Sequence, residues 1–172
     1  MKKNNIYLWT GEGAGKTTSA LGVSLRAVGH KKKVVVIQFM KGRKYIGEYK
    51  IMQKLKPYYQ IFQFGSPNFI KPLTKPTKKD KELAARGLEF VRNVVKKKPH
   101  LLVLDEINLA CAIGLVNIDV VVDLVKYCSD YTIVYLTGRK APSKLKQVAG
   151  FVNEVKLLKS PKKYPVRKGI EW

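Results

Sequence analysis

Six short apolar runs along the chain are separated by stretches in which apolar residues recur at helical spacing. Runs of this length that end in turn-forming residues are typical of buried strands. The run 33–39 is rich in β-branched residues and nearly all apolar, which favours a parallel strand covered on both faces. The six expected strands are residues 6–9, 33–39, 60–64, 100–105, 132–136 and 151–158.

Helical periodicity is clearest over residues 17–28 and 80–97. We expect Gly29 to cap the first of these helices at its C-terminus and Asp80 to cap the second at its N-terminus. Weaker patterns predict helices over residues 48–55, near Leu109 and over residues 119–127. Strands that alternate with helices favour an α/β fold, with a mostly parallel sheet flanked by helices.

Residues 65–79 carry Pro67, Pro72 and Pro76 and are expected to form a loop. This loop is longer than most connections in compact domains, which favours a functional loop over a spacer. A chain of 172 residues suits a single domain, residues 1–172. No apolar run reaches about 18 residues and no signal peptide is evident, so we expect no membrane span and a cytoplasmic protein.

The charge is strongly basic, with 34 Lys and Arg against 12 Asp and Glu and a formal net charge of +22. Such a value favours nucleic-acid binding. Basic residues crowd residues 13–47, which contain no acid, whereas residues 105–130 hold five acids and one lysine. A nucleic acid, a triphosphate or a solvated lysine-rich surface would each fit this composition.

The first expected strand runs into Thr-Gly-Glu-Gly-Ala-Gly-Lys-Thr-Thr at residues 10–18. A phosphate-binding loop needs glycines that turn backbone N–H groups inward, a helix N-terminus, a lysine and a hydroxyl for Mg²⁺. Position 10 is Thr where the usual pattern has Gly, and Gly11 and Gly13 supply the flexibility instead. The sequence therefore predicts a P-loop. Its candidate ATP-binding residues are Gly11, Glu12, Gly13, Ala14, Gly15, Lys16, Thr17 and Thr18.

Asp105 and Glu106 follow the apolar run Leu101–Leu104. Acids at the carboxyl end of a buried strand lie where α/β sheets bind ligands, and in P-loop proteins such an acid holds Mg²⁺. A carboxylate pair at a helix N-terminus is the structural alternative. Together with the P-loop, the metal interpretation is favoured, with Thr17 and either Asp105 or Glu106 as ligands.

Further blocks extend the pattern beyond a generic P-loop. They read VVIQFMKG at residues 35–42, VLDEIN at 103–108, LTGRKAP at 136–142 and RKGIEW at 167–172. With these blocks the chain resembles the ATP:corrinoid adenosyltransferases of the cob(I)alamin adenosyltransferase type, nearly from end to end. The resemblance implies a RecA-like P-loop fold.

The resemblance also implies an activity, which is transfer of the 5′-deoxyadenosyl group of ATP to the Co(I) of a corrinoid, with release of triphosphate. The reduced cobalt is the nucleophile, so the protein positions the substrates and stabilises the leaving triphosphate. Lys16 and Arg139 are the candidate catalytic cations, and Lys41 is a further ATP-binding candidate. The resemblance further implies Mg²⁺, a homodimer and an electron donor that reduces the cobalt.

Three departures from the family pattern stand out. Ala14 replaces a lysine or similar residue, which removes one charge from the phosphate site. In the expected corrinoid-binding loop, Phe69 is present but Lys71 stands where the family often has Trp, so Phe69, Ile70 and Lys71 are the corrinoid-binding candidates. We expect the short N-terminus not to supply the segment that covers the active site in many members of the family.

Two other functions remain open at this stage. The net charge of +22 is compatible with a nucleic-acid-associated P-loop ATPase, although no nucleic-acid-binding module is recognisable and a nucleic-acid partner is not expected. A P-loop kinase for a small metabolite would use the same two motifs.

Overall fold

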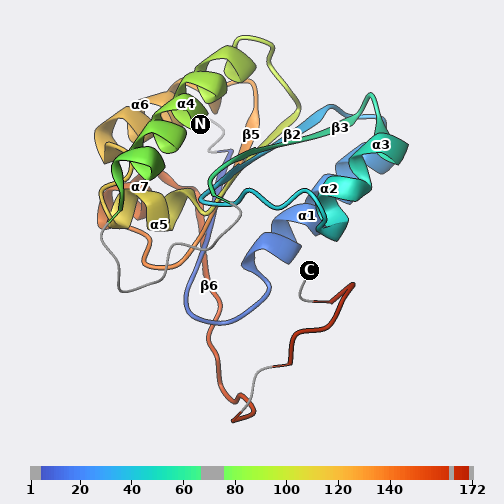
Figure 1. The fold of residues 1–172 in the computed structure, drawn as a ribbon. Helices are drawn as coiled ribbons and strands as arrows, with labels where there is room; N and C mark the ends of the chain where they lie inside the picture. Colours follow the sequence, from blue (N-terminus) through green and yellow to red (C-terminus); the bar gives the residue numbers. More distant parts are fainter. Residues whose placement is uncertain (1–4, 67–75, 163–164, 171–172) are drawn as a thin grey trace.

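The computed structural model describes residues 5–66, 76–162 and 165–170, which build one six-stranded parallel sheet with helices on both faces (Figure 1). The strand order is β3-β2-β4-β5-β1-β6. The strands are β1 (Ile6–Thr10), β2 (Val34–Phe39), β3 (Tyr59–Phe64), β4 (Leu101–Asp105), β5 (Ile133–Thr137) and β6 (Phe151–Glu154). All pairings are parallel. Parallel strands need long crossover connections, which the helices between the strands provide.

Helices α1, α2 and α3 lie on one side of the sheet and α4, α5, α6 and α7 on the other (Figure 1). Their bounds are α1 (Lys16–Gly29), α2 (Gly47–Lys50), α3 (Met52–Leu55), α4 (Lys78–Val95), α5 (Ile107–Ala112), α6 (Ile118–Cys128) and α7 (Ser143–Val148). No helix in this described part of the chain is long and apolar enough to cross a membrane.

The core forms on both faces because successive side chains of a strand point in opposite directions. In β2, Val35 and Ile37 pack with the apolar face of α4, whereas Val34 and Val36 pack with Ala20 of α1. All six residues of β2 are buried, as expected for a strand covered on both sides.

Strand β5 lies between β1, which leads into the P-loop, and β4, which ends at Asp105. Register pairs Trp9 with Thr137, and Gln38 with Asp105. The carboxyl ends of four strands therefore meet at one edge of the sheet, where α/β proteins bind their ligands.

The expected elements are confirmed to within two residues at most of their ends, with four differences. The predicted last strand, residues 151–158, stops at Glu154, because its neighbour β1 ends at Thr10 and turns into the P-loop. The predicted helix over residues 48–55 is two short helices, α2 and α3. Helix α7 was not predicted, because only Leu145 of its six residues is fully buried and its apolar pattern is weak.

The fourth difference concerns helix capping. Thr77, and not Asp80, is the N-cap of α4: its hydroxyl accepts from the Asp80 N–H, and Asp80 accepts in return from the Thr77 N–H. This reciprocal capping box moves the start of the helix to Lys78 and shortens the expected loop. The expectation that Gly29 is the C-cap of α1 is also wrong: Gly29 is the last residue of the helix, His30 is the C-cap, and Lys31 makes the left-handed turn with φ 54°.

Candidate functional site

The turn between β1 and α1 has the backbone of a phosphate-binding loop. Gly11 and Gly15 have φ of 100° and 102°, values that glycine tolerates and other residues rarely adopt. The Lys16 side chain is mostly buried and its Nζ donates to the carbonyl oxygen of Gly13, so the lysine reaches back across the loop. Burial, followed by the positive charge of Arg139, lowers the pKa of Lys16.

The segment that follows β6 is hydrogen-bonded to this loop. Val155 accepts a hydrogen bond from the Gly13 N–H and donates one to the Thr10 carbonyl oxygen, both at 2.8 Å. A side chain at Gly11 would collide with the Val155 carbonyl, and a Cβ at Gly13 would lie 2.7 Å from Val155 Cγ1. Gly11 and Gly13 are therefore required by this close approach of the backbone.

Asp105 is the centre of a buried hydrogen-bond network. Its Oδ1 accepts from the hydroxyls of Thr17 at 2.8 Å and Thr137 at 2.6 Å. Its Oδ2 accepts from Gln38 Nε2 at 3.0 Å and Lys41 Nζ at 2.7 Å. Burial alone would raise the pKa of this carboxyl, but the Lys41 charge and these hydrogen bonds outweigh burial and hold the pKa below its usual value.

Lys41 lies just beyond the end of β2, after a left-handed turn at Met40 with φ 57°. Its Nζ lies 2.7 Å from Asp105 Oδ2 and 3.2 Å from Thr17 Oγ1. Burial opposes the charged form of Lys41, but the Asp105 carboxylate raises its pKa above the ordinary value. An ammonium group thus lies against both the hydroxyl and the acid that the P-loop motif brings together.

Glu106 lies on the other side of Asp105, at the N-cap of α5, with φ 62°. Its N–H donates to Thr137 Oγ1 at 3.1 Å, and a Cβ at Gly138 would lie 3.2 Å from Glu106 Oε2. Burial, followed by the neighbouring Asp105 charge, raises the pKa of Glu106. Of the two acids, the structure therefore brings Asp105 into contact with Thr17, whereas the Glu106 carboxylate lies beside Gly138.

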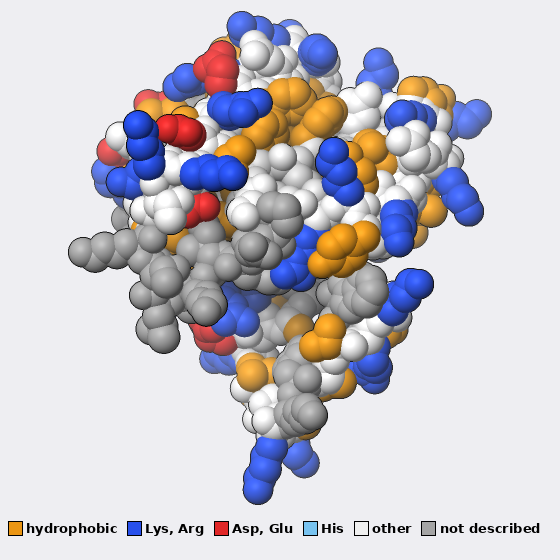
Figure 2. All heavy atoms as spheres, in the orientation of Figure 1, with side chains coloured by type: hydrophobic (Ala, Val, Ile, Leu, Met, Phe, Trp, Pro, Cys, Tyr) orange, Lys and Arg blue, Asp and Glu red, His pale blue; other side chains and the backbone are white. Residues whose placement is uncertain are grey.

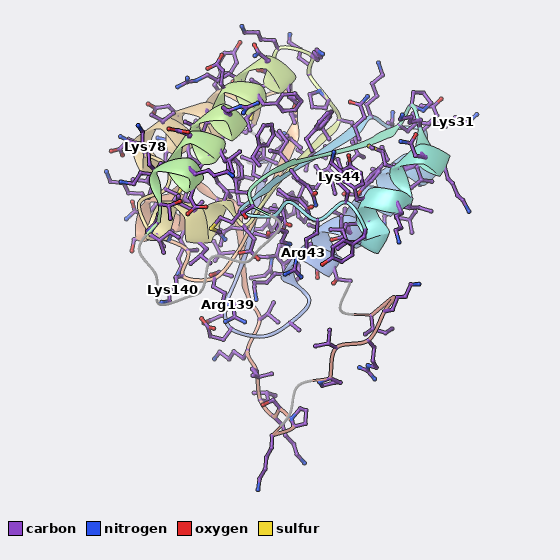
Figure 3. The ribbon with its side chains drawn as sticks, in the orientation of Figure 1. Lys31, Arg43, Lys44, Lys78, Arg139 and Lys140 are labelled. Carbon is purple, nitrogen blue, oxygen red and sulfur yellow. The ribbon has the colours of Figure 1, made fainter. Side chains whose placement is uncertain are left out.

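Arg139 follows β5 and lies beside the P-loop, with Lys140 next to it (Figure 3). Its guanidinium forms an ion pair with Glu12 of the P-loop at 3.0 Å, and both side chains are more than half exposed. The turn that carries Arg139 is anchored by Thr10, whose hydroxyl accepts from the Ala141 N–H at 3.1 Å. This contact uses the threonine that replaces the expected first glycine of the P-loop.

A cavity of about 460 Å³ opens beside the P-loop threonines, between α1 and the short helices α2 and α3. Its size lies in the range of small-molecule sites. Its walls are mostly apolar, with polar groups at the P-loop end. The lining residues are Thr17, Thr18, Leu21, Leu25, Lys41, Gly47, Glu48, Ile51, Leu55, Tyr59, Gly169 and Ile170.

Residues 2–172 match the family model described as ATP:corrinoid adenosyltransferase BtuR/CobO/CobP. The chain belongs to this family. It is 30% identical to a corrinoid adenosyltransferase of Sinorhizobium sp, with 99% of this chain and 78% of that protein covered. It is also 30% identical to a corrinoid adenosyltransferase of Escherichia coli strain K12, with 90% and 77% covered. The family assignment makes the protein an enzyme with ATP and a corrinoid as substrates.

Among solved structures, the chain is similar to the flagellar accessory protein FlaH from Methanocaldococcus jannaschii, with a TM-score of 0.57 and 14% identity. The match covers 92% of this chain and 73% of FlaH. At this identity the likeness concerns the fold alone, and it confirms the expected RecA-like P-loop architecture of the adenosyltransferase.

The structure gathers most of the site residues expected of this adenosyltransferase. Lys41 and Asp105 contact Thr17 of the P-loop, and Arg139 forms an ion pair with Glu12 of the same loop, although they come from different segments of the chain. Lys16 lies in the loop itself. Ala14 is exposed in the loop. The corrinoid-binding candidates Phe69, Ile70 and Lys71 lie outside the described residues.

Four polar residues near the carboxyl ends of the strands were not predicted to lie beside the P-loop and Asp105. Gln38 and Thr137 bind Asp105, and Gln63 donates from Nε2 to Gln38 Oε1 at 2.9 Å. Asn108 donates from Nδ2 to the carbonyl oxygens of Trp9 and Gly138, which ties α5 to β1 and β5. A polar residue inside an apolar strand, as Gln38 is, was the one signal in the sequence that could have identified such a partner.

Proposed function

We propose that this adenosyltransferase binds the triphosphate of ATP on residues 11–18 and presents the ribose 5′ carbon to a Co(I) corrinoid. A lone pair of Co(I) forms the cobalt–carbon bond, the C5′–O bond breaks, and its electron pair leaves with the triphosphate. The observation that carries this proposal is that Arg139 forms an ion pair with Glu12 of the P-loop that contains Lys16, in a chain of this family.

Lys16 and Arg139 are proposed to act on the leaving group. Negative charge grows on the triphosphate as the C5′–O bond breaks, so fixed cations beside it lower the barrier. Burial first, and then electrostatic repulsion by the Arg139 guanidinium, lowers the pKa of Lys16. An anion bound between them would relieve that repulsion.

We propose Mg²⁺ as the cofactor, with Thr17 and Asp105 as its protein ligands. The donor set fits this ion. Mg²⁺ prefers an octahedron of oxygen ligands at 2.0–2.1 Å, and two neighbouring oxygens of such an octahedron are about 2.9 Å apart. Thr17 Oγ1 and Asp105 Oδ1 are 2.8 Å apart. The remaining ligands are proposed to be phosphate oxygens, water or Glu106. Mg²⁺ held there would neutralise charge on the triphosphate.

The cavity beside Thr17 and Thr18 is proposed to receive the nucleoside of ATP. Its apolar walls, which include Leu21 and Ile51, suit an aromatic base, and it adjoins the residues proposed to hold the phosphates. A ligand that spans both regions would have an anionic end and an apolar end, as ATP has.

The corrinoid is proposed to contact Phe69, Ile70 and Lys71. Support comes from the start of this segment: the Met40 N–H donates to the Phe64 carbonyl at 3.0 Å, and a Cβ at Gly65 would collide with the backbone of Met40 and Lys41. The segment therefore leaves the sheet beside Lys41, at the edge where the P-loop lies. A homodimer, an electron donor for the cobalt, a cytoplasmic location and one domain over residues 1–172 complete the proposal.

The two alternative functions predict different products. Lysine and arginine side chains are spread over the face seen in Figure 2 and gather in no single stripe, which does not favour a nucleic-acid track. A nucleic-acid-dependent ATPase or a metabolite kinase would release ADP, whereas the proposed reaction releases triphosphate.

The test uses the purified protein with ATP and a chemically reduced corrinoid under anaerobic conditions. We expect a photolabile cobalt–carbon product in the absorption spectrum and an equal amount of triphosphate by ion chromatography. Lys16→Ala is the matched negative control, and Lys44→Ala, an exposed lysine, is the positive one. ADP and phosphate with no corrinoid adduct would refute the proposal.

A further inference from the structure

The Lys41 ammonium lies against the two groups that a P-loop protein uses to bind a divalent cation. Lys41 Nζ is 3.2 Å from Thr17 Oγ1 and 2.7 Å from Asp105 Oδ2, and Thr17 and Asp105 themselves are 2.8 Å apart. The Asp105 carboxylate is fully buried, whereas the Lys41 side chain is 18% exposed. The lysine reaches the buried acid from the solvent side of the site, the side from which a phosphate-bound metal ion would arrive.

Both oxygens of Asp105 are fully used in this arrangement. Oδ1 accepts from Thr17 and Thr137, and Oδ2 accepts from Gln38 and Lys41. Gln38 and Thr137 belong to strands and are buried, so they cannot easily leave. Lys41 is the partner that can withdraw, because it lies beyond the end of β2 on a long flexible side chain.

A divalent cation and the Lys41 ammonium cannot share these ligands at low cost. Two positive charges would lie a few ångströms apart in a site shielded from water, where their repulsion is far stronger than in bulk solvent. Without any cation, however, the buried Asp105 carboxylate would lack a counter-charge. One cation is needed here, and two are unfavourable.

We propose that Lys41 and the divalent cation occupy this position in turn. In the nucleotide-free protein the Lys41 ammonium neutralises Asp105 and keeps free metal ions out. When a metal–triphosphate complex arrives, the metal takes over Thr17 and Asp105, and Lys41 moves onto the triphosphate. The exchange makes metal binding dependent on nucleotide, since only the triphosphate offers the displaced ammonium a new anionic partner. This inference rests on the proposed use of Mg²⁺.

Mn²⁺ binding to the nucleotide-free protein tests the exchange without any turnover. The free Mn²⁺ signal in electron paramagnetic resonance gives the dissociation constant for the wild type, Lys41→Met and Lys41→Gln. Removing the ammonium should tighten Mn²⁺ binding at least about tenfold in both variants. Lys44→Met removes an exposed lysine three positions away and should behave as the wild type. Equal, weaker or absent Mn²⁺ binding in both Lys41 variants would overturn the proposal.

Thermal unfolding supplies a second readout, which also guards against a variant that folds poorly. In EDTA, Lys41→Met should unfold at a lower temperature than the wild type, because Asp105 has lost its counter-charge. Added Mn²⁺ should restore that temperature in Lys41→Met and leave the wild type unchanged. Equal responses of the two proteins to Mn²⁺ would count against the exchange. Failure of the proposed function would be seen separately: the cobalt–carbon product would be absent, whatever dissociation constants are measured for Mn²⁺.

Discussion

Gln38 Nε2 donates to Asp105 Oδ2 at 3.0 Å, and both side chains are completely buried. The two residues are directly opposite each other on the neighbouring strands β2 and β4. Gln38 in turn accepts from Gln63 Nε2 of β3 at 2.9 Å, so a chain of amides extends from the edge of the sheet to the acid. Asp105 is thereby held in one orientation before any ligand binds.

Gln38→Leu should destabilise the protein by about 1–3 kcal/mol, because it removes a donor from a buried carboxylate and leaves Gln63 Nε2 with the Arg43 carbonyl oxygen and without its Gln38 acceptor. Gln38→Glu should cost more, since it places a second carboxylate against Asp105, and part of that loss should be regained at acidic pH. Urea unfolding measures both. Gln60→Leu, at an exposed position of β3, is the matched control. A Gln38→Leu variant as stable as Gln60→Leu would contradict this role.

Arg139→Ala should lower kcat for adenosyl transfer by about a hundredfold, because the guanidinium is proposed to stabilise the departing triphosphate. The KM for ATP should change less. Lys140→Ala, which removes the neighbouring cation (Figure 3), should leave kcat unchanged. Steady-state rates from corrinoid absorbance separate the two constants. An equal effect of both substitutions would indicate that only the general positive charge matters.

Gly13→Ala should lower the unfolding free energy by about 1–3 kcal/mol and weaken ATP binding, because its Cβ would lie 2.7 Å from Val155 Cγ1. Val155→Ala in the same chain should recover part of both losses. Gly22→Ala is the control: a Cβ there meets nothing within 4 Å, so the helix should gain about 0.5–1 kcal/mol. Calorimetry measures unfolding and ATP binding. A double variant no better than Gly13→Ala would show that the backbone of Val155 sets the limit.

Glu106→Gln should be more stable than the wild type at neutral pH, and the difference should shrink as the pH falls. The pKa of Glu106 is raised in the folded protein by burial and then by Asp105, so its ionised form opposes folding. Acid protonates Glu106 in the fold first and removes that penalty. Urea unfolding over a pH series checks the sign, with Glu82→Gln on an exposed turn of α4 as control. A gap that widens towards acid would refute the assignment.

Ile51→Arg should raise the KM for ATP and leave inhibition by inorganic triphosphate unchanged. Ile51 lines the proposed nucleoside cavity and is 40% exposed, so the fold should tolerate the substitution. Tyr45→Arg changes an exposed side chain that is not among the cavity-lining residues and should leave both values as they are. If Ile51→Arg weakens triphosphate inhibition as much as ATP binding, the cavity does not distinguish nucleoside from phosphate.

The elements whose cause is local follow from the amino-acid sequence alone. The P-loop is a run of neighbouring residues in which glycines allow the backbone to turn, and the strand before Asp105 is an apolar run that has to be buried. The alternation of strands and helices was enough to predict an α/β sheet. The further family-like sequence segments, which are distributed along the whole chain, were enough to predict the family. Lys16, Thr17 and Asp105 could be identified because each belongs to a recognisable motif that lies at the end of a predicted strand or the start of a predicted helix.

Which side chains meet at the site depends on how the strands and helices pack. Lys41 and Asp105 are 64 positions apart, and Thr10 and Ala141 are 131 apart. No local pattern specifies such contacts, since they depend on the order in which six strands pair. The placement of β5 between β1 and β4 brings Thr137 to Asp105, and the pairing of β2 with β4 brings Gln38 and, one turn beyond the strand, Lys41. The amino-acid sequence sets the identity of each residue, whereas the pairing of the strands sets its neighbours, because hydrogen bonds between strands align positions that are far apart in the sequence.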